Sequence, residues 1–232
     1  MMKLTIIIPV YNEEKTILEV IEKVKEAEAL NLKKEIIVVD DFSKDSTKEM
    51  LLKLKDGAVK IFFHDKNKGK GAAIRTGLKH ATGDIILIQD ADLEYSPKEY
   101  PKLLRPIIQD EAKVVYGSRL EAIRKNLDNM YKLHYFGNVF LSVMTNALYG
   151  SKITDMETGY KVFRKEVVQD MKLRARRFDF EPEITAKILK KGCRIKEIPI
   201  DFMGRNFKEG KKITWKDGIK ALYYLIKYRL VD

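Results

Sequence analysis

Cysteine is almost absent from this sequence, and histidine is rare. The single cysteine, Cys193, excludes both an internal disulfide and a thiolate metal site within one chain. The three histidines are His64, His80 and His134, and their separations do not match a metal-ligand motif. The chain is therefore expected to fold around an apolar core in a reducing, cytoplasmic setting.

Long apolar runs are also missing. No uninterrupted apolar stretch approaches the roughly 20 residues that a membrane-spanning helix needs. The apolar run at residues 4–9 is too short for the core of a secretory signal peptide. If a membrane is involved, we expect the protein to bind peripherally to its cytoplasmic face or to act with a separate membrane subunit.

Several signatures of nucleotide-binding and nucleic-acid-binding proteins are not found. No GxGxxG follows the first apolar run, no Walker lysine motif occurs, and neither a C₂H₂ nor an RNP motif is present. The formal net charge is nevertheless +11, from 45 Lys and Arg against 34 Asp and Glu. Such a surplus favours anionic partners such as nucleotides or acidic lipids, and nucleic acid is not expected among them.

The first half of the chain alternates between strand and helix patterns. Patterns that start helices include Asn12, as the N-cap of a helix to about Leu30, and a capping box of Ser46 and Glu49. These patterns separate short apolar runs at 4–9, 35–39, 59–63, 85–88 and 114–116. Continuous apolar strands joined by helices predict an α/β domain with a mostly parallel sheet sandwiched between helices.

The second half is less regular. It contains an apolar segment at 131–149, a helix pattern at 183–190, a strand pattern at 195–202, a basic loop at 204–212 and an amphipathic C-terminal helix at 215–229. The apolar segment and the final helix fit elements that lie in a membrane interface. They fit equally well a core or a dimer face, and both interpretations stay open.

Polar side chains gather where the predicted strands end. In parallel sheets, ligands bind at the carboxyl ends of the strands. Asp90 and Asp92 follow the run at 85–88, with Glu94 beyond them, and together form a compact set of oxygens suited to Mg²⁺ or Mn²⁺. A loop whose acids only cap turns is the alternative.

Two further segments are candidates for binding a nucleotide. Asp40 and Asp41 could accept hydrogen bonds from a ribose or a base edge, or could merely cap the turn that follows. The glycine-rich segment 68–71 with Arg75 offers backbone and cations to a phosphate, or is only a flexible turn before a helix.

The order of these motifs resembles family 2 glycosyltransferases with the GT-A fold. The segments are PVYNEE at 9–14, VDDFS at 39–43, NKGKG at 67–71 and DAD at 90–92. GSR at 117–119, TDMETGYK at 154–161 and the basic loop narrow the resemblance to the polyprenyl-phosphate glycosyltransferases, among them the dolichyl-phosphate mannose synthases. It covers nearly the whole chain as one domain, 1–232, with a nucleotide-sugar half at 1–120 and an acceptor half at 121–232.

Together with the candidates above, the resemblance implies roles for individual residues. The metal would be held by Asp90, Asp92 and Glu94, where many relatives have Gln in place of Glu94. The nucleotide sugar would contact Pro9, Tyr11, Glu13, Asp40, Asp41, Lys70, Gly71, Arg75, Asp90, Ala91, Arg205 and Lys211. The acceptor phosphate would contact Arg119, Arg205 and either Lys132 or His134. The catalytic set would be Asp92, Arg119 and Asp155.

The expected activity is a metal-dependent, inverting transfer of a hexose from a GDP-mannose or UDP-glucose type donor to a polyprenyl or dolichyl phosphate. Such an acceptor is already ionised near neutral pH, because its second phosphate pKa lies near ~6, so no base is needed. A saccharide hydroxyl acceptor would instead need a base, for which Asp155 or Glu157 is the candidate. A non-enzymatic nucleotide-binding or lipid-binding protein is the third hypothesis.

Overall fold

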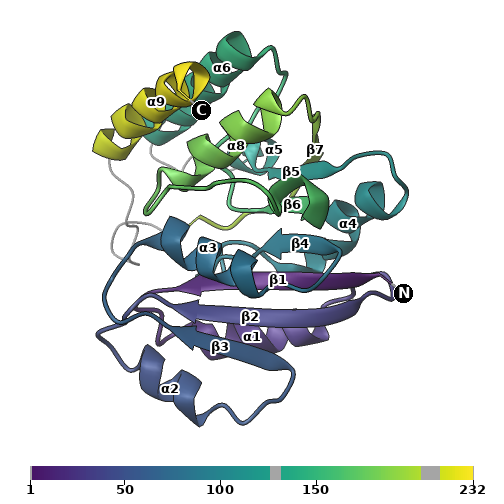
Figure 1. Cartoon of the computed structure of the whole chain (residues 1–232), viewed down its shortest axis with the longest axis vertical. Helices are drawn as coiled ribbons and strands as arrows, with labels where there is room; N and C mark the ends of the chain where they lie inside the picture. The colour runs from purple at the N-terminus through teal and green to yellow at the C-terminus, as the bar shows by residue number, and fades with distance from the viewer. Residues whose placement is uncertain (1, 126–131, 205–214, 232) are drawn as a thin grey trace.

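A seven-stranded sheet organises the computed structural model of the chain, which describes residues 2–125, 132–204 and 215–231. The strand order is β3-β2-β1-β4-β6-β5-β7, and Figure 1 shows the sheet with the helices around it. The strands are β1 (Lys3–Val10), β2 (Lys33–Asp40), β3 (Val59–Phe63), β4 (Ile85–Ile88), β5 (Val114–Ser118), β6 (Lys161–Arg164) and β7 (Ile195–Pro199).

The helices alternate with the strands through the first half of the chain, as expected. They are α1 (Ile17–Glu26), α2 (Thr47–Lys53), α3 (Lys70–His80), the 3₁₀ turn η1 (Pro97–Glu99), α4 (Tyr100–Ile108), α5 (Leu120–Lys125), α6 (Lys132–Tyr149), α7 (Lys165–Val168), α8 (Phe180–Lys190) and α9 (Trp215–Leu230). No helix within the described ranges is long and apolar enough to span a membrane.

All described strands run parallel except β6, which is antiparallel to both of its neighbours, β4 and β5. Lys161, the first residue of β6, pairs with Ile88, the last residue of β4. The reversed strand therefore begins at the edge of the sheet where the parallel strands end. Strand β6 was not predicted from the sequence, because the segment 154–164 is polar and contains a glycine.

Alternating side chains of the strands enter two separate apolar cores. Ile6 and Ile8 of β1 belong to the core covered by α1, α2 and α4. Ile7 belongs to the core covered by α3, α7 and α8. Because successive side chains of a strand point to opposite faces, a continuous apolar run fills both cores. The predicted α/β class, with helices on both faces, is confirmed.

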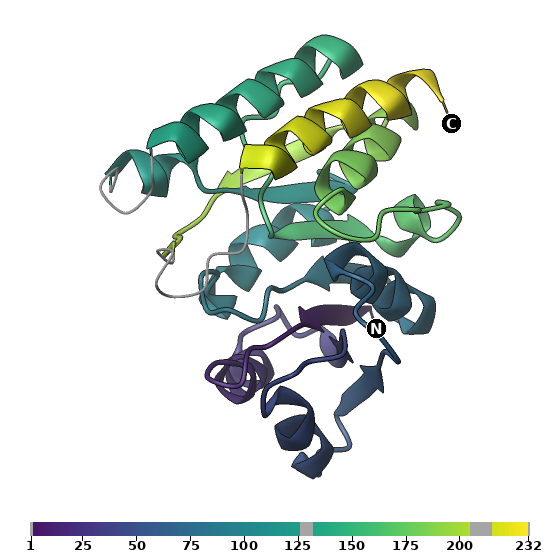
Figure 2. The same ribbon diagram turned by 90° about the vertical axis from the view of Figure 1, so that its left-hand side faces the viewer.

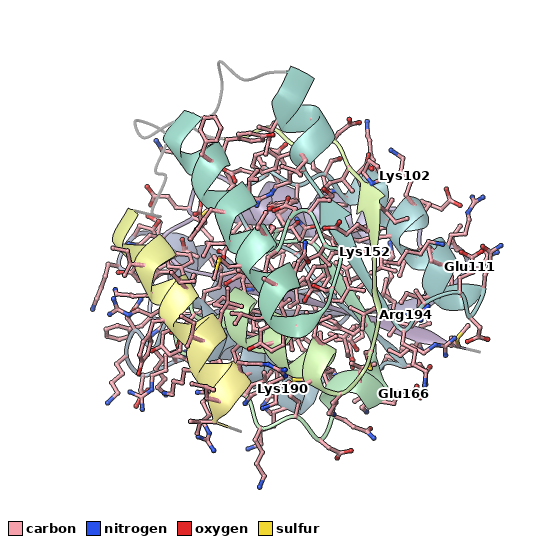
Figure 3. The ribbon with its side chains drawn as sticks, turned by 90° about the horizontal axis from the view of Figure 1, so that it is seen from above. Lys102, Glu111, Lys152, Glu166, Lys190 and Arg194 are labelled. Carbon is pink, nitrogen blue, oxygen red and sulfur yellow. The ribbon has the colours of Figure 1, made fainter. Side chains whose placement is uncertain are left out.

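Helices α6 and α9 form an additional layer at one end of the molecule. They lie side by side and α9 also packs on α8, as Figures 2 and 3 show from two directions. A small apolar cluster holds this layer together: Leu141, Ile153, Met156, Ala221 and Leu225. The apolar segment and the amphipathic helix predicted in the second half thus pack against each other.

The first predicted helix start differs from the structure. Asn12 has a φ of 53°, and its side-chain oxygen accepts from the backbone N–H of Lys44 at 2.7 Å instead of capping a helix. Helix α1 begins only at Ile17 and ends at Glu26. It cannot reach Leu30, because Leu30 has a φ of 51°, which lies outside the helical region.

The capping box before α2 is also not formed. Ser46 is the N-cap residue of α2, but its side chain makes no capping hydrogen bond. The Asp45 carboxylate instead accepts from the backbone N–H of Thr47 at 3.0 Å. The helix lies where it was predicted, but a different side chain satisfies its first donor.

Candidate active site

The carboxyl ends of β1 and β4 are tied together around Ala91. The Thr16 hydroxyl, which follows β1 in the chain, donates to the Ala91 carbonyl at 2.7 Å. Glu13 donates its backbone N–H to Thr47 at 2.9 Å. Pro9 lies within β1, and Tyr11 and Glu13 are half-buried just beyond it. The structure therefore brings the first and fourth predicted motifs to one edge of the sheet.

Lys70 connects this edge to the second half of the chain. Its Nζ lies 2.8 Å from Asp90 Oδ1 and 3.1 Å from Glu181 Oε1. Burial alone would lower the pKa of Lys70, but attraction to these two carboxylates outweighs burial and holds the pKa well above its ordinary value. A cation that stays charged thus lies directly against the first aspartate of the DAD motif.

Gly159 packs against the other oxygen of the same aspartate. It donates its backbone N–H to the Tyr95 hydroxyl at 2.7 Å. A Cβ at this position would collide with Asp90 Oδ2 and lie 2.9 Å from the Tyr95 ring. The segment that precedes the reversed strand β6 thus approaches the DAD motif so closely that only glycine fits.

The three carboxylates predicted to hold a metal do not converge on one point. Within the described ranges, no three acidic, histidine or cysteine side chains form a group that could hold a metal ion. Asp92 Oδ1 accepts from the backbone N–H of Glu94 at 3.2 Å across a turn in which Leu93 has a φ of 62°. Mg²⁺ commonly uses only one or two carboxylates together with substrate phosphates. Asp90 and Asp92 fit that donor set. The prediction that Glu94 joins them as a third ligand is not supported by the described structure.

Asp40 and Asp41 both form hydrogen bonds inside the protein. Asp40 is fully buried and accepts from the backbone and hydroxyl of Ser43 at 3.2 and 2.5 Å. Asp41 accepts from the backbone N–H groups of Lys68 and Gly69 at 2.8 and 2.7 Å, and it bonds the His64 ring at 2.7 Å. The Asp40 contacts match the capping alternative, whereas Asp41 holds the glycine-rich segment in place.

The glycine-rich segment also packs against the chain itself. Gly71 donates its backbone N–H to the Arg177 carbonyl at 3.3 Å, and Ala72 donates to the Arg176 carbonyl at 3.0 Å. Gly69 has a φ of 93°, and a Cβ there would collide with Arg176. The Gly71 and Ala72 N–H groups at the start of α3 are therefore already satisfied, and close packing explains the glycines at 69 and 71.

Arg75 lies one turn further along α3. Its side chain makes its hydrogen bond with a part of the chain other than the DAD motif. Its Nη1 donates to the Leu173 carbonyl at 3.0 Å. No described hydrogen bond or ion pair connects it with Asp90 or Asp92 among the residues that the structure covers. Its predicted part in nucleotide-sugar binding therefore gains no support from these contacts.

Arg119 and Asp155 form a buried, bidentate ion pair. The Arg119 Nε and Nη2 atoms donate to the two carboxylate oxygens at 2.7 and 2.6 Å, and the Arg119 backbone N–H donates at 2.9 Å. Burial would raise the pKa of Asp155, but the guanidinium outweighs burial and holds the pKa below its ordinary value. Both oxygens are engaged, so Asp155 is poorly placed to accept a proton from a hydroxyl.

A second buried cluster of charges was not predicted as a unit from the sequence. Lys161 donates to the carbonyls of Met156, at 3.1 Å, and Thr158, and burial lowers its pKa. Burial and then repulsion from Glu181 raise the pKa of Glu157, whose Oε1 is shielded from solvent without a hydrogen-bond partner in the described structure. Glu181 lies at the start of α8, and no pattern in the sequence connects it with the other members.

The side chains of four predicted site residues are not described by the structure. Arg205 and Lys211 lie outside the described residues. Lys132 and His134 lie in the first turn of α6, whose backbone is described, but their side chains are not.

The fold and these strand-end motifs define a class of protein. A mostly parallel α/β sheet with a DAD motif after β4 and a reversed strand beside it is the architecture of GT-A glycosyltransferases. The chain belongs to Glycosyl transferase family 2, because the sequence model of that family matches residues 5–172. It is therefore a glycosyltransferase.

Curated relatives match along almost the whole chain. A UDP-N-acetylglucosamine–dolichyl-phosphate N-acetylglucosaminyltransferase of Methanococcus voltae is 32% identical over 97% of this chain and 95% of its own length. A dolichol-phosphate mannosyltransferase of Pyrococcus furiosus is 32% identical over 98% of this chain and 64% of its own length. A dolichyl-phosphate beta-glucosyltransferase of Trichomonas vaginalis is 30% identical over 97% and 72%.

Solved structures match the whole chain in fold. Glucosyl-3-phosphoglycerate synthase from Mycobacterium tuberculosis, in complex with Mn²⁺ and UDP-glucose, superposes with a TM-score of 0.77 over 100% of this chain and 80% of that chain. The sequence identity is 16%. This structural similarity confirms the GT-A fold. At this low sequence identity it does not indicate which ligands the present chain binds.

Proposed function

We propose that this chain transfers a hexose from a nucleotide sugar to a polyprenyl phosphate, with inversion at the sugar carbon. The three relatives described above act, by name, on dolichyl phosphate with three different sugars. The bidentate Arg119–Asp155 pair is the observation that supports the lipid phosphate most directly. A hydroxyl acceptor would need the Asp155 carboxylate as a base, but Arg119 already occupies both of its oxygens. An ionised phosphate acceptor needs no base.

The donor would lie at the DAD motif. Asp90 and Asp92 would hold Mg²⁺ or Mn²⁺, which supplies charge stabilisation for the leaving diphosphate. Lys70, already fixed against Asp90 at 2.8 Å, adds a permanent positive charge beside the same group. The donor would be of the GDP-mannose or UDP-glucose type, and the N-acetylglucosaminyl relative adds a third sugar to be tested.

The acceptor phosphate would approach Arg119. The guanidinium is held by Asp155 and lies 5.3 Å from the centre of the Phe202 ring. Its remaining N–H donors suit a phosphate oxygen, since guanidinium groups bind carboxylate and phosphate with several donors at once. Asp155 would therefore position Arg119 and keep it charged.

A membrane surface would deliver the acceptor to the α6–α9 layer. Phe136, Phe140 and Val143 of α6 are exposed, and they follow the helical spacing of four and then three residues. Such a stripe lies on one side of a helix. Exposed apolar stripes of this kind let helices lie in the membrane interface.

Transfer to a lipid can be measured directly. Purified protein with Mg²⁺ or Mn²⁺ is incubated with a panel of labelled nucleotide sugars and a short polyprenyl phosphate, and the label is extracted into organic solvent. We expect label in the organic phase with one of the donors, and loss of that signal in an Asp92→Asn variant. Label that appears only in water-soluble saccharides would overturn the proposal.

A hydroxyl acceptor is the second candidate function, because of Glu157. Its carboxylate has a raised pKa and an oxygen without a hydrogen-bond partner in the described structure, which are properties of a general base. A Glu157→Gln variant separates the two functions. Transfer to a saccharide that depends on Glu157 favours the hydroxyl acceptor, whereas lipid transfer that persists in the variant excludes this role.

A further inference from the structure

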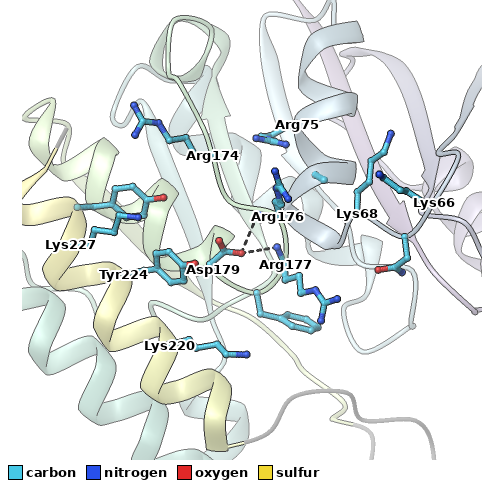
Figure 4. Close-up of a pocket in the computed structure, with 14 residues that line it drawn as sticks. Lys66, Lys68, Arg75, Arg174, Arg176, Arg177, Asp179, Lys220, Tyr224 and Lys227 are labelled. Atoms are coloured by element: carbon cyan, nitrogen blue, oxygen red, sulfur yellow. Dashed lines mark hydrogen bonds between the residues drawn. The ribbon is translucent and has the colours of Figure 1, made fainter.

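A strongly basic cavity lies beside the candidate active site. It has a volume of about 830 Å³ and is lined by residues 66–68, by α3, by residues 174–179 and by α9. Figure 4 shows lysine and arginine side chains from all four segments around it. Eight cationic side chains line the cavity against one carboxylate, that of Asp179.

The single acid does little to balance this charge. Asp179 Oδ1 accepts the backbone N–H groups of Arg176 and Arg177 at 3.1 and 2.6 Å, so it shapes the segment that carries the arginines. The Arg75 Nε atom is buried and has no hydrogen-bond partner in the described structure. Like charges that converge on one cavity raise its positive potential and attract anions.

The cavity and the DAD motif lie on two sides of the glycine-rich segment. Lys70 contacts Asp90 and Glu181 and does not line the cavity. Lys66 and Lys68, only a few residues earlier, line the cavity. The cationic cavity is thus distinct from the acidic end of the sheet where the metal and the sugar diphosphate are proposed to bind.

Helix α9 contributes both cations and apolar surface at this place. Lys220, Tyr224 and Lys227 line the cavity. A second stripe of α9 is exposed and apolar: Ile219, Tyr223, Ile226 and Leu230. At roughly 100° per residue the two stripes are neighbours around the helix. Anionic charge next to an apolar body is the chemistry of a membrane lipid at the interface.

We propose that this cavity binds the phosphate headgroup of an anionic membrane lipid that is not the substrate. The headgroup would enter among the guanidinium and ammonium groups while the exposed stripe of α9 touches the outer acyl region. The enzyme would thereby be held on anionic membrane with a defined orientation. This inference rests on the proposed lipid acceptor only for the expectation that the enzyme works at a membrane.

Vesicle flotation tests the proposal with two matched variants. Arg176→Gln combined with Lys227→Gln removes two cavity charges, and Lys33→Gln combined with Lys53→Gln removes two exposed charges elsewhere. We expect wild-type protein to prefer phosphatidylglycerol vesicles over phosphatidylcholine vesicles. The cavity variant should lose about tenfold in affinity for the anionic vesicles, and the control variant should retain wild-type binding. Circular dichroism melting checks that both variants fold.

Three outcomes would overturn the inference. The first is equal binding to both vesicle types. The second is equal loss of binding in the two variants, which would indicate only net charge. The third is displacement from vesicles by glycerol phosphate or by a nucleotide sugar, which would assign the cavity to a soluble ligand or to the donor. Sugar transfer to a short, soluble acceptor is measured separately, so that its absence would reject the proposed function and leave this result standing.

Discussion

The ammonium group of Lys70 lies between carboxylates that come from distant parts of the chain. The sequence predicted Lys70 and Asp90 as members of one site, because the glycine-rich segment and the DAD motif both belong to the motif order of family 2 glycosyltransferases. It could not predict Glu181, since no local pattern relates the start of α8 to the glycine-rich segment. It also left open whether Asp41 binds a ligand or caps the turn that follows, and the observed bonds to Lys68 and Gly69 are a contact that it did not predict.

Removing the charge of Lys70 should weaken donor binding. A Lys70→Gln variant leaves Asp90 and Glu181 without their shared cation and removes a positive charge beside the proposed diphosphate. We expect the affinity for a nucleoside diphosphate with Mn²⁺ to fall about tenfold, as a charge-assisted hydrogen bond contributes ~1.5–3 kcal/mol. Isothermal titration calorimetry measures it, with Lys79→Gln at the exposed end of α3 as the control. Unchanged affinity in Lys70→Gln would remove Lys70 from the donor site.

A side chain at Gly159 should disturb the DAD motif. In a Gly159→Ala variant, the new methyl group would collide with Asp90 and press on the Tyr95 ring, so one of the two must move. We expect kcat/KM to fall by up to about 100-fold, since a displacement of ~1 Å can have that effect. Gly57→Ala is the matched control, because its methyl group would meet no atom within 4 Å. Equal activity of the two variants would show that the contact does not matter for the reaction.

At the scale of helices and strands, apolar runs were the most reliable guide. The strands Val59–Phe63 and Ile85–Ile88 coincide with the predicted runs; β4 is buried along its whole length, whereas β3 is mostly half-buried and includes the exposed Lys60. Strand β6 was not predicted because it has only four residues and begins with Lys161, a buried cation that resembles a loop residue. The predicted start of α1 at Asn12 is wrong, because the Asn12 side chain accepts a hydrogen bond from a neighbouring loop and does not cap the helix.

Glu35 joins several elements of the sheet and should contribute to stability in a pH-dependent way. Its buried carboxylate accepts from Lys3, Lys60 and Thr5 at 3.0, 2.8 and 2.6 Å, and from the backbone and hydroxyl of Thr82 at 2.8 Å each. Burial would raise the pKa of Glu35, but these donors outweigh burial and hold the pKa well below its ordinary value. The stabilisation is therefore complete above the ordinary glutamate pKa of about 4.3 and is lost as the pH falls below it.

A Glu35→Gln variant should be less stable by about 3 kcal/mol at pH 7, because a neutral amide cannot replace the charge-assisted hydrogen bonds that the buried carboxylate accepts. Urea unfolding at several pH values measures the difference from wild type, which should shrink below about pH 4. Glu19→Gln, which removes an exposed pair with Lys23, is the control and should change little. A difference that stays constant down to pH 3 would contradict the assigned pKa direction.

At the scale of the whole molecule, the α6–α9 layer gives the protein one apolar side. The sequence left open whether these segments form a core or a membrane surface, and the structure shows that each helix has one buried apolar face and one exposed apolar face. Leu141 and Leu225 are buried between the helices, whereas Phe140 and Ile226 are 51% and 42% exposed. The apolar composition of these two helices predicts that one face of each is buried. Which apolar residues stay exposed to solvent depends on how the two helices pack, and the sequence does not give that.

Replacing the exposed apolar residues of this layer should separate membrane binding from catalysis. In a variant with Phe140→Ser and Ile226→Ser, we expect binding to phosphatidylcholine vesicles to fall by at least about tenfold, because each apolar side chain contributes ~1.5–3 kcal/mol when fully buried and a tenfold change needs only ~1.4 kcal/mol. Turnover of a short, soluble acceptor should be unchanged. Leu52→Ser, at a 62% exposed position on α2, is the control. Loss of vesicle binding in the control variant alone would place the membrane-facing side elsewhere.

The reversed strand β6 also determines when the enzyme can become active during its synthesis. Strand β4 and the DAD motif leave the ribosome early, but β4 pairs with β6, and Lys70 contacts Glu181 of α8. The Lys70–Asp90 pair therefore lacks both Gly159, which packs on Asp90, and Glu181, which contacts Lys70, until much of the second half has been translated. Because β5 must accept β6 between itself and β4, the growing chain has to keep that place in the sheet open. A nascent chain that ends before α8 should accordingly be unable to bind the donor, however well its first four strands have folded.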